Sequence, residues 1–169
     1  MDHFFKQLRD QSHGQGDSDR HLLTLYGIGR GSRAKRILEL GIREGRTTLP
    51  LLLAAHENGG TLISVDNVVV SYSPPVELEG SWQHVVQDSL IFLEERAKEN
   101  CIFDLIYLDD WHAYSHVKAE LELIDQLVTP SSVVLIHDLM YWTSPYYHSD
   151  LTLREGQWAD GGPYRAVAE

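Results

Sequence analysis

The sequence has one cysteine, no long apolar run and few basic residues. Cys101 cannot form an internal disulfide, and no histidine stands beside it at a spacing typical of a zinc motif, so we expect a small buried apolar residue. The longest apolar run, residues 49–55, is much shorter than the roughly 20 residues that cross a membrane. The N-terminus lacks a positively charged segment followed by an apolar one, so we expect no secretory signal and a cytoplasmic protein.

The shortage of basic residues also bears on partners. The chain has 14 Lys and Arg against 25 Asp and Glu, a formal net charge of −11. Such a charge opposes binding to a phosphate backbone unless a basic patch overcomes it. The basic cluster at 30–36 is short and precedes a predicted strand, so we expect a solvated loop. The sequence predicts neither a nucleic-acid partner nor a membrane partner.

The 169 residues and 43% hydrophobic content are typical of one soluble domain. We expect residues 1–18 to form a flexible or partly helical lead-in, because their second half is polar and contains glycine. Residues 19–169 are predicted to form a single α/β domain. Within it, Ser18 is expected to cap a helix through about Tyr26, which Gly27, Gly29 and Gly31 would end.

Short apolar runs of strand length alternate with helical segments from residue 36 onward. The five predicted strands are Ile37–Leu40, Leu62–Val65, Trp82–Val86, Leu105–Leu108 and Val133–Ile136. A buried helix face is expected along Val117, Leu121, Ile124 and Val128, and an earlier helix carries Leu49, Leu52, Leu53 and His56. Strands that do not alternate and are separated by helices indicate a parallel sheet covered on both faces. The predicted fold is therefore doubly wound, Rossmann-like α/β.

Acidic residues accompany the end of every predicted strand. They are Glu39, Asp66, Asp88, the pair Asp109 and Asp110, and Asp138, which follows His137. Ligands in doubly wound sheets bind outside the carboxyl ends of the strands, so we expect these side chains to share one edge. A single acid there can cap a helix or remain solvated. Five together predict a negative edge that selects a cation or a metal.

The turn after the first strand contains two glycines, Gly41 and Gly45, where the chain must turn sharply or let a ligand approach. Thr47 or Thr48 can cap the following helix. The turn is not the G-x-G-x-x-G of dinucleotide sites, and its acids would repel a pyrophosphate. S-adenosylmethionine carries two cationic groups and no phosphate, so it suits this turn better.

Two later strand ends complete the predicted cofactor site. Asp66 is placed for a bidentate hydrogen bond to ribose hydroxyls, with Asn67 beside it. Asp88 and Ser89 are placed near the adenine. The predicted cofactor-binding residues are Glu39, Gly41, Gly45, Thr47, Asp66, Asn67, Asp88 and Ser89.

Four motifs in this order carry a resemblance to a known family. They are Glu-Leu-Gly-x-x-x-Gly-x-Thr-Thr from residue 39, Leu-Ile-Ser-Val-Asp from residue 62, Asp-Leu-Ile-Tyr-Leu-Asp-Asp-Trp-His from residue 104, and Leu-Ile-His-Asp from residue 135. Residues 36–140 resemble the class I S-adenosylmethionine-dependent methyltransferases. Within that class they are similar to the metal-dependent O-methyltransferases, which include catechol and macrolide-sugar enzymes. The resemblance implies an enzyme that uses S-adenosylmethionine and a divalent metal, Mg²⁺ or Mn²⁺.

The resemblance also implies residue roles. Asp109 and Asp138 correspond to metal ligands, and His137 stands where the family has Asp or Glu. As a ligand, His137 would shift the preference away from Mg²⁺; as a residue beside the ligands, it would orient a carboxylate. His112 stands where the family has its general base, which accepts the proton of a hydroxyl that the metal has made more acidic. Asp110 is the competing base.

The same resemblance implies a small-molecule methyl acceptor, such as a sugar, a phenol or another natural product. Aromatic residues after the fourth and fifth strands could wall its pocket: Trp111, Tyr114, Trp142, Tyr146 and Tyr147. Family members end in a β-hairpin for which this sequence shows no counterpart. We therefore expect one of three cases: a truncated C-terminus, a partner chain such as a second copy that covers the sheet edge, or a substitute formed by residues 141–158. Two alternatives stay open: a non-catalytic domain that binds S-adenosylmethionine or a nucleoside, and a non-haem iron oxygenase.

Overall fold

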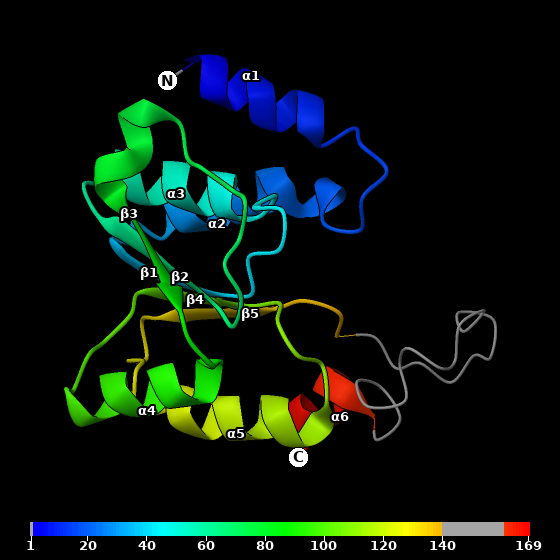
Figure 1. The fold of residues 1–169 in the computed structure, drawn as a ribbon, viewed down its shortest axis with the longest axis vertical. Coiled ribbons are helices and arrows are strands. Elements are labelled where there is room, and N and C mark those ends of the chain that lie inside the picture. The colour runs from blue at the N-terminus through cyan, green and yellow to red at the C-terminus, as the bar shows by residue number, and fades with distance from the viewer. Residues whose placement is uncertain (1, 140–160) are drawn as a thin grey trace.

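The computed structural model describes residues 2–139 and 161–169 and contains one parallel sheet between two layers of helices (Figure 1). The strands lie in the order β3-β2-β1-β4-β5. Their bounds are β1 Arg36–Leu40, β2 Thr61–Asp66, β3 Trp82–Val86, β4 Leu105–Leu108 and β5 Val133–Ile136. This architecture confirms the doubly wound α/β prediction and all five predicted strands.

The helices divide between the two faces of the sheet (Figure 1). Those on one face are α1 Asp2–Gln11, α2 Leu22–Gly31 and α3 Thr48–Glu57. Those on the other are α4 Ser89–Lys98, α5 Tyr114–Ile124 and α6 Gly162–Ala168. Two short 3₁₀ helices, η1 Asp19–His21 and η2 Val76–Ser81, complete the described elements.

Each face of the sheet has its own hydrophobic core, because successive side chains of a strand point to opposite faces. Ile37 of β1 packs with α1, α2 and α3, whereas Leu38 and Leu40 belong to a core formed with α4, α5 and the chain just after α5. Glu39 lies between these last two in sequence and therefore faces the α3 side. This alternation places a carboxylate inside an apolar layer.

The N-terminal region contains two helices. Helix α1 lies in the segment expected to be flexible or partly helical, and it buries Phe4 and Leu8 in the core. Helix α2 continues through its glycines to Gly31, because Gly29 lies against α3, where an added Cβ would be 3.0 Å from the Ala54 Cβ. The glycine allows close helix packing rather than ending the helix, and the Ser18 side chain forms no capping hydrogen bond.

Three further expectations can be compared with the described residues. The predicted face in α5 is shorter than expected: Val117 and Ile124 are buried in the helix, but Val128 lies beyond its end. Cys101 is half-buried rather than buried. Trp142, Tyr146, Tyr147 and the segment 141–158 fall outside the described residues.

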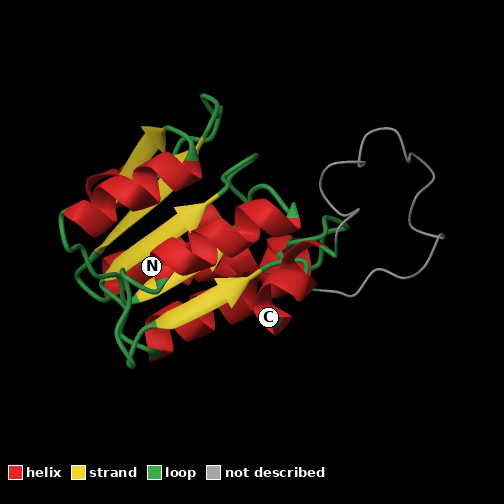
Figure 2. Cartoon of the chain, turned by 90° about the horizontal axis from the view of Figure 1, so that it is seen from below, coloured by secondary structure: helices red, strands yellow, loops and turns green. Residues whose placement is uncertain are grey.

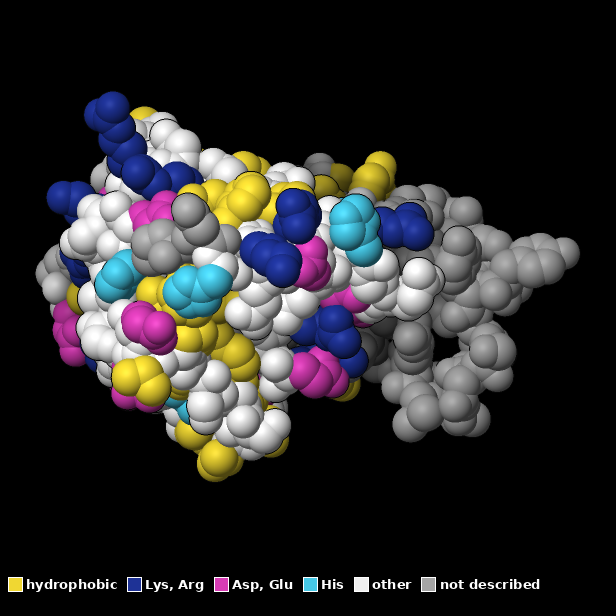
Figure 3. All heavy atoms as spheres, turned by 90° about the horizontal axis from the view of Figure 1, so that it is seen from above, with side chains coloured by type: hydrophobic (Ala, Val, Ile, Leu, Met, Phe, Trp, Pro, Cys, Tyr) yellow, Lys and Arg dark blue, Asp and Glu magenta, His cyan; other side chains and the backbone are white. Residues whose placement is uncertain are grey.

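All five strands point the same way, so their carboxyl ends meet at one edge (Figure 2). Seen over α1, the surface mixes basic, acidic, histidine and hydrophobic side chains (Figure 3). No described helix combines the length and the apolar character needed to cross a membrane. Because all five strands are parallel, the predicted site residues that follow them converge at the edge formed by their carboxyl ends.

Candidate functional site

A cavity opens at the carboxyl edge of the sheet, between the loops that follow β1, β2, β3 and β4. Its lining residues are Gly41, Arg43, Val65, Asp66, Asn67, Gln87, Asp88, Ser89, Asp109, Asp110, Trp111 and His116. Five of the eight predicted cofactor residues border it: Gly41, Asp66, Asn67, Asp88 and Ser89. The structure thus brings most of the predicted cofactor site together around one cavity.

The turn after β1 is shaped by Gly41 and Asp66. Gly41 has a φ of +88°, and a Cβ on it would overlap the carbonyl oxygen of Asp109, so only glycine fits without displacing that loop. Asp66 Oδ2 accepts hydrogen bonds from the N–H groups of Ile42 (3.0 Å) and Arg43 (3.3 Å). Asp66 therefore holds the turn in place as well as facing the cavity.

Asp88 combines a place in the cavity wall with a helix cap. Its carboxylate accepts hydrogen bonds from the N–H groups of Leu90 (3.0 Å) and Ile91 (3.2 Å) at the start of α4. One acid of the predicted negative edge, Asp88, therefore caps the N-terminus of a helix. This is the other role that the sequence analysis gives to a single acid at a strand end.

Glu39 does not border the cavity, because it is fully enclosed between β1 and α3. Its carboxylate accepts hydrogen bonds from Thr47 Oγ1 (2.7 Å), Thr48 Oγ1 (2.9 Å) and Ser64 Oγ (2.6 Å). Burial raises the pKa of Glu39 to about 7 despite these three hydroxyls. The two threonines thus serve Glu39 instead of capping α3, and Glu39 is not part of an exposed acidic edge.

The other two predicted residues of the first turn lie away from this cavity as well. Gly45 has a φ of +75° and leaves room for the ring of Tyr72, which a Cβ would overlap. Thr47 borders a smaller hollow that also includes Gly41 and Asp109. Gly45 therefore serves packing in this structure, and the contribution of Thr47 to cofactor binding stays a prediction.

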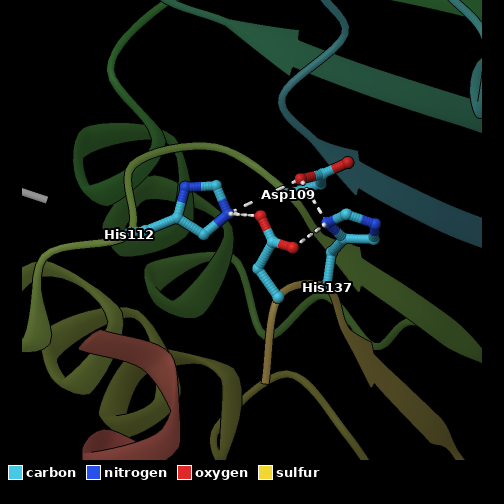
Figure 4. Close-up of side chains that lie close together, drawn as sticks. Asp109, His112 and His137 are labelled. Atoms are coloured by element: carbon cyan, nitrogen blue, oxygen red, sulfur yellow. Dashed lines mark ion pairs between the residues drawn. The ribbon is translucent and has the colours of Figure 1, made fainter. Parts of the chain in front are cut away.

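Four side chains converge beside the cavity: Asp109, His112, His137 and Asp138 (Figure 4). Each offers one ligand atom, and these four atoms lie within 4.8 Å of one another. His137 Nδ1 is 3.2 Å from Asp109 Oδ1 and 3.2 Å from Asp138 Oδ1. His112 Nε2 is 3.4 Å from Asp138 Oδ2 and 3.6 Å from Asp109 Oδ1. We call this group the Asp109 cluster.

The Asp109 cluster exists because β4 and β5 are neighbouring parallel strands. Asp109 and His112 follow β4, whereas His137 and Asp138 follow β5, with Leu108 paired with Ile136 at the last register position. Asp138 has a φ of +55°, a left-handed conformation that Asp tolerates better than most residues. Such backbone strain is concentrated at functional sites in proteins.

In the Asp109 cluster, attraction between opposite charges affects the pKa values of Asp109 and His137 more than burial does. Burial disfavours the carboxylate of Asp109, but His112 and His137 lower its pKa to about 2. Burial also disfavours the imidazolium of His137, but Asp109 and Asp138 raise its pKa to about 10. The two carboxylates therefore favour a positive charge between them, which is carried by the His137 imidazolium and which a metal ion would supply only after His137 loses this proton.

The donor set of the Asp109 cluster fits a metal ion. His137 Nδ1 is buried and forms no hydrogen bond of ordinary geometry with a described residue, although two carboxylate oxygens are near. Carboxylate oxygens suit Mg²⁺ and Mn²⁺, whereas imidazole favours Mn²⁺ and later transition metals. His21 also lies near: its ring centre is 5.7 Å from the ring centre of His137, and the two rings are close to perpendicular. The structure places His112, the predicted base, beside the three residues that the sequence predicts as metal ligands.

A second group of side chains, which sequence spacing did not reveal, meets in the cavity wall. His116 Nε2 is 3.0 Å from Ser89 Oγ, 3.3 Å from Glu120 Oε1 and 3.5 Å from Asp110 Oδ2. Asp110 and Glu120 raise the pKa of His116 to about 10, against the effect of burial. The separation of four residues between His116 and Glu120 was the available signal, since it places both on one helix face.

The predicted aromatic wall is represented by two described residues. Trp111 borders the cavity and is 46% exposed, so its ring is available to a ligand. Tyr114 instead lies under the Arg165 guanidinium, whose carbon is 4.0 Å from the ring centre. Only Trp111 of this pair faces the cavity, and the remaining three aromatic residues lie outside the described ranges.

Comparison with known proteins identifies the fold and the family. The model of a family described as a methyltransferase domain matches residues 38–139, a range that includes the end of β1 and all of the other four strands. No curated protein matches the sequence.

Solved structures with a similar fold include three methyltransferases. The O-methyltransferase TomG from Streptomyces achromogenes, in complex with S-adenosylmethionine, is 19% identical with a TM-score of 0.58 over 72% of this chain and 56% of its own. An O-methyltransferase from Bacillus cereus, with S-adenosylhomocysteine, is 17% identical with a TM-score of 0.58 over 80% and 64%. MycE of the mycinamycin pathway, with Mg, S-adenosylhomocysteine and mycinamycin VI, is 16% identical with a TM-score of 0.59 over 93% and 44%. This chain therefore spans less than two thirds of each of these proteins.

Proposed function

We infer the function from one premise: the chain belongs to the family of methyltransferase domains, whose model matches residues 38–139. We propose that it transfers the methyl group of S-adenosylmethionine to a hydroxyl of a small molecule and that a divalent cation assists the transfer. The cavity at the carboxyl edge of the sheet, lined by Gly41, Asp66 and Asp88, is the proposed site of S-adenosylmethionine, and we call it the cofactor cavity. The observation that carries this proposal is the position of Asp109, which borders the cofactor cavity and belongs to the Asp109 cluster. A methyl donor in the cavity and an acceptor at the cluster would meet there.

The cavity suits S-adenosylmethionine better than a nucleotide phosphate. Four of its lining residues are acids, Asp66, Asp88, Asp109 and Asp110, against one arginine, Arg43. Such a lining repels a pyrophosphate and tolerates a sulfonium and an ammonium. Asp66 would accept hydrogen bonds from the ribose hydroxyls, and Ser89 would lie near the adenine.

Asp109, His137 and Asp138 are the proposed metal ligands. When bound, the cation would lower the pKa of the acceptor hydroxyl and orient it toward the methyl group. The imidazole in the donor set favours Mn²⁺ over Mg²⁺. Asp109 and Asp138 would supply the negative charge that either ion needs.

His112 is the proposed general base. Its Nε2 atom faces the same two carboxylates, within 3.6 Å of each, and so lies beside the place where the hydroxyl would bind. In the proposed reaction, Nε2 would accept the hydroxyl proton while the oxygen takes the methyl group of S-adenosylmethionine, whose bond from that carbon to sulfur would break. The products are the methyl ether, S-adenosylhomocysteine and a protonated His112.

The decisive experiment has two arms. Calorimetric titration with S-adenosylhomocysteine tests the cofactor site, and methyl transfer to a panel of hydroxylated sugars and phenols tests the reaction, with Mn²⁺, Mg²⁺ or a chelator present. We expect cofactor binding without metal and turnover only with metal. No binding of S-adenosylhomocysteine would contradict the cofactor assignment, whereas turnover that persists in chelator would contradict the metal assignment. Cofactor binding without turnover on any acceptor would favour the non-catalytic alternative.

A further inference from the structure

We propose that Asp110, His116 and Glu120, with Ser89 beside them, form a second divalent-cation site, separate from the Asp109 cluster. Asp109 and Asp110 are adjacent in the chain, and each supplies a carboxylate to a different group of converging side chains. The second group stands at the junction of three elements: the loop after β4, the start of α4 and the buried side of α5.

The oxygen atoms around His116 are arranged like the ligands of one cation. Nε2 of His116 faces three oxygens at once: Ser89 Oγ at 3.0 Å, Glu120 Oε1 at 3.3 Å and Asp110 Oδ2 at 3.5 Å. A single N–H can point well at only one of them. One positive ion among these atoms would satisfy the imidazole nitrogen and both carboxylates together.

Glu120 provides the independent observation. Its side chain is completely buried, with 0% exposure, yet neither of its oxygens forms a hydrogen bond of ordinary geometry with a described residue. A buried carboxylate without such partners is strongly disfavoured unless it is neutralised or coordinates a metal. Glu120 Oε1 points at His116 Nε2, so the unmet acceptor faces the centre of the group.

The distances and the atom types indicate the class of ion. Ligands about 2.1 Å from a tetrahedral ion lie about 3.4 Å from one another. The three separations from His116 Nε2, between 3.0 and 3.5 Å, match that spacing. One imidazole with two carboxylates is a donor set for Zn²⁺ or a neighbouring transition metal rather than for Mg²⁺.

Three of the four residues, Ser89, Asp110 and His116, also border the cofactor cavity, whereas Glu120 stands behind them. An ion at this place would fix the cavity wall by joining α4 and α5 to the loop after β4. The proposal does not depend on methyl transfer, because its test measures metal binding alone.

The test counts Zn²⁺ ions bound to the untagged full chain after removal of metals by a chelator. Calorimetric titration of the wild-type protein should show two sites. His116→Gln and Glu120→Gln should each lose one site, with an affinity decrease of at least about 100-fold, because a direct ligand contributes more than an outer partner. Asp138→Asn should lose the other site and keep this one. His13→Gln, at an exposed histidine outside both groups, is the matched control and should keep two sites.

Circular dichroism and thermal melts establish that each variant folds. If a variant fails to fold, anomalous diffraction at the zinc edge from wild-type crystals decides, since an ion between His116 and Glu120 gives a peak there. Wild-type stoichiometry retained in both His116→Gln and Glu120→Gln, or no anomalous peak at this position, would overturn the proposal. Loss of a site in Asp138→Asn but not in His116→Gln would support only the Asp109 cluster.

Discussion

Gly41 and Asp109 are so close that a Cβ on the glycine would overlap the carbonyl oxygen of the aspartate. Gly41 follows β1 and Asp109 follows β4, and these two strands are neighbours in the sheet. Asp109 also borders the cofactor cavity and contributes to the Asp109 cluster. This contact therefore joins the turn of the proposed cofactor site to the proposed metal site.

Gly41→Ala should impair both sites at once. The substitution places a Cβ at a φ of +88° and against the loop that carries Asp109. We expect the affinity for S-adenosylhomocysteine and for Mn²⁺ each to fall at least about tenfold, measured by calorimetry. Gly27→Ala is the control, because a Cβ there meets nothing within 4 Å, and alanine in a helix should stabilise by about 0.5 to 1 kcal/mol. Equal affinities in Gly41→Ala and wild type would show that the contact is unimportant.

Asp66→Ala should weaken the cofactor specifically. It removes charge-assisted hydrogen bonds to the ribose, each worth about 1.5 to 3 kcal/mol, so the affinity for S-adenosylhomocysteine should fall at least about tenfold. Because Asp66 also accepts hydrogen bonds from the turn, a thermal melt should accompany the calorimetry. Asp125→Ala, at an exposed position in the chain after α5, is the control. Unchanged binding in Asp66→Ala would rule out the ribose assignment.

Asp138→Asn should abolish the metal dependence and leave cofactor binding nearly intact. Asn tolerates the left-handed φ of +55° that Asp138 adopts, so the loop should keep its shape while one carboxylate charge is lost. We expect Mn²⁺ affinity to fall by at least about 100-fold, measured by calorimetry. Asp138 does not border the cofactor cavity, which is why the affinity for S-adenosylhomocysteine should change little. Full Mn²⁺ affinity in this variant would remove Asp138 from the metal site.

His112→Ala should slow turnover by about 10²- to 10⁴-fold, the contribution of a positioned general base. If His112 accepts the proton and does not ligate the metal, calorimetry should show retained affinity for both Mn²⁺ and S-adenosylhomocysteine. His13→Ala, at an exposed histidine, should keep wild-type turnover. Full turnover in His112→Ala would transfer the base assignment to Asp110 or to solvent, whereas loss of Mn²⁺ binding would make His112 a ligand.

Glu39→Gln should change how stability depends on pH. Burial raises the pKa of Glu39 from its ordinary 4.5 to about 7, so the folded state holds this proton more tightly than the unfolded state. The stabilisation of the folded state by this proton is fully present below pH 4.5 and is lost as the pH rises through 7, a change of about 3 kcal/mol. Urea unfolding at several pH values measures this change. The free energy of unfolding of the variant, relative to that of wild type, should rise by up to that amount between acid and alkaline pH.

The control for this measurement is Glu122→Gln, which removes a carboxylate from an exposed position of α5. Its stability should run parallel to that of the wild type between acid and alkaline pH. If Glu39→Gln and Glu122→Gln behave alike, the buried carboxylate of Glu39 does not dominate the pH dependence of stability.

Several features of the site follow from local sequence. Apolar runs of strand length define β4 and β5 at their observed bounds, because parallel strands covered by helices are rich in continuous hydrophobic segments. Once the strands are parallel, the residues after them must share an edge, and Asp109 and Asp138 do. Sequence spacing could not reveal that Glu39 is buried and accepts hydrogen bonds from the threonines. An acid at a strand end can equally lie on an exposed edge or be buried beside a residue such as Thr47.

The sequence by itself determined the fold class, the edge at which the predicted site residues meet and the convergence of Asp109, His137 and Asp138, because strand periodicity and parallel direction are local properties with one geometric consequence. Only the tertiary structure decided how closely His112, the base that the resemblance implies, approaches the two carboxylates and that His116 meets Glu120, Asp110 and Ser89. Those contacts depend on how a loop folds back and how α5 turns against α4, and such rotations come from packing among residues far apart in the chain.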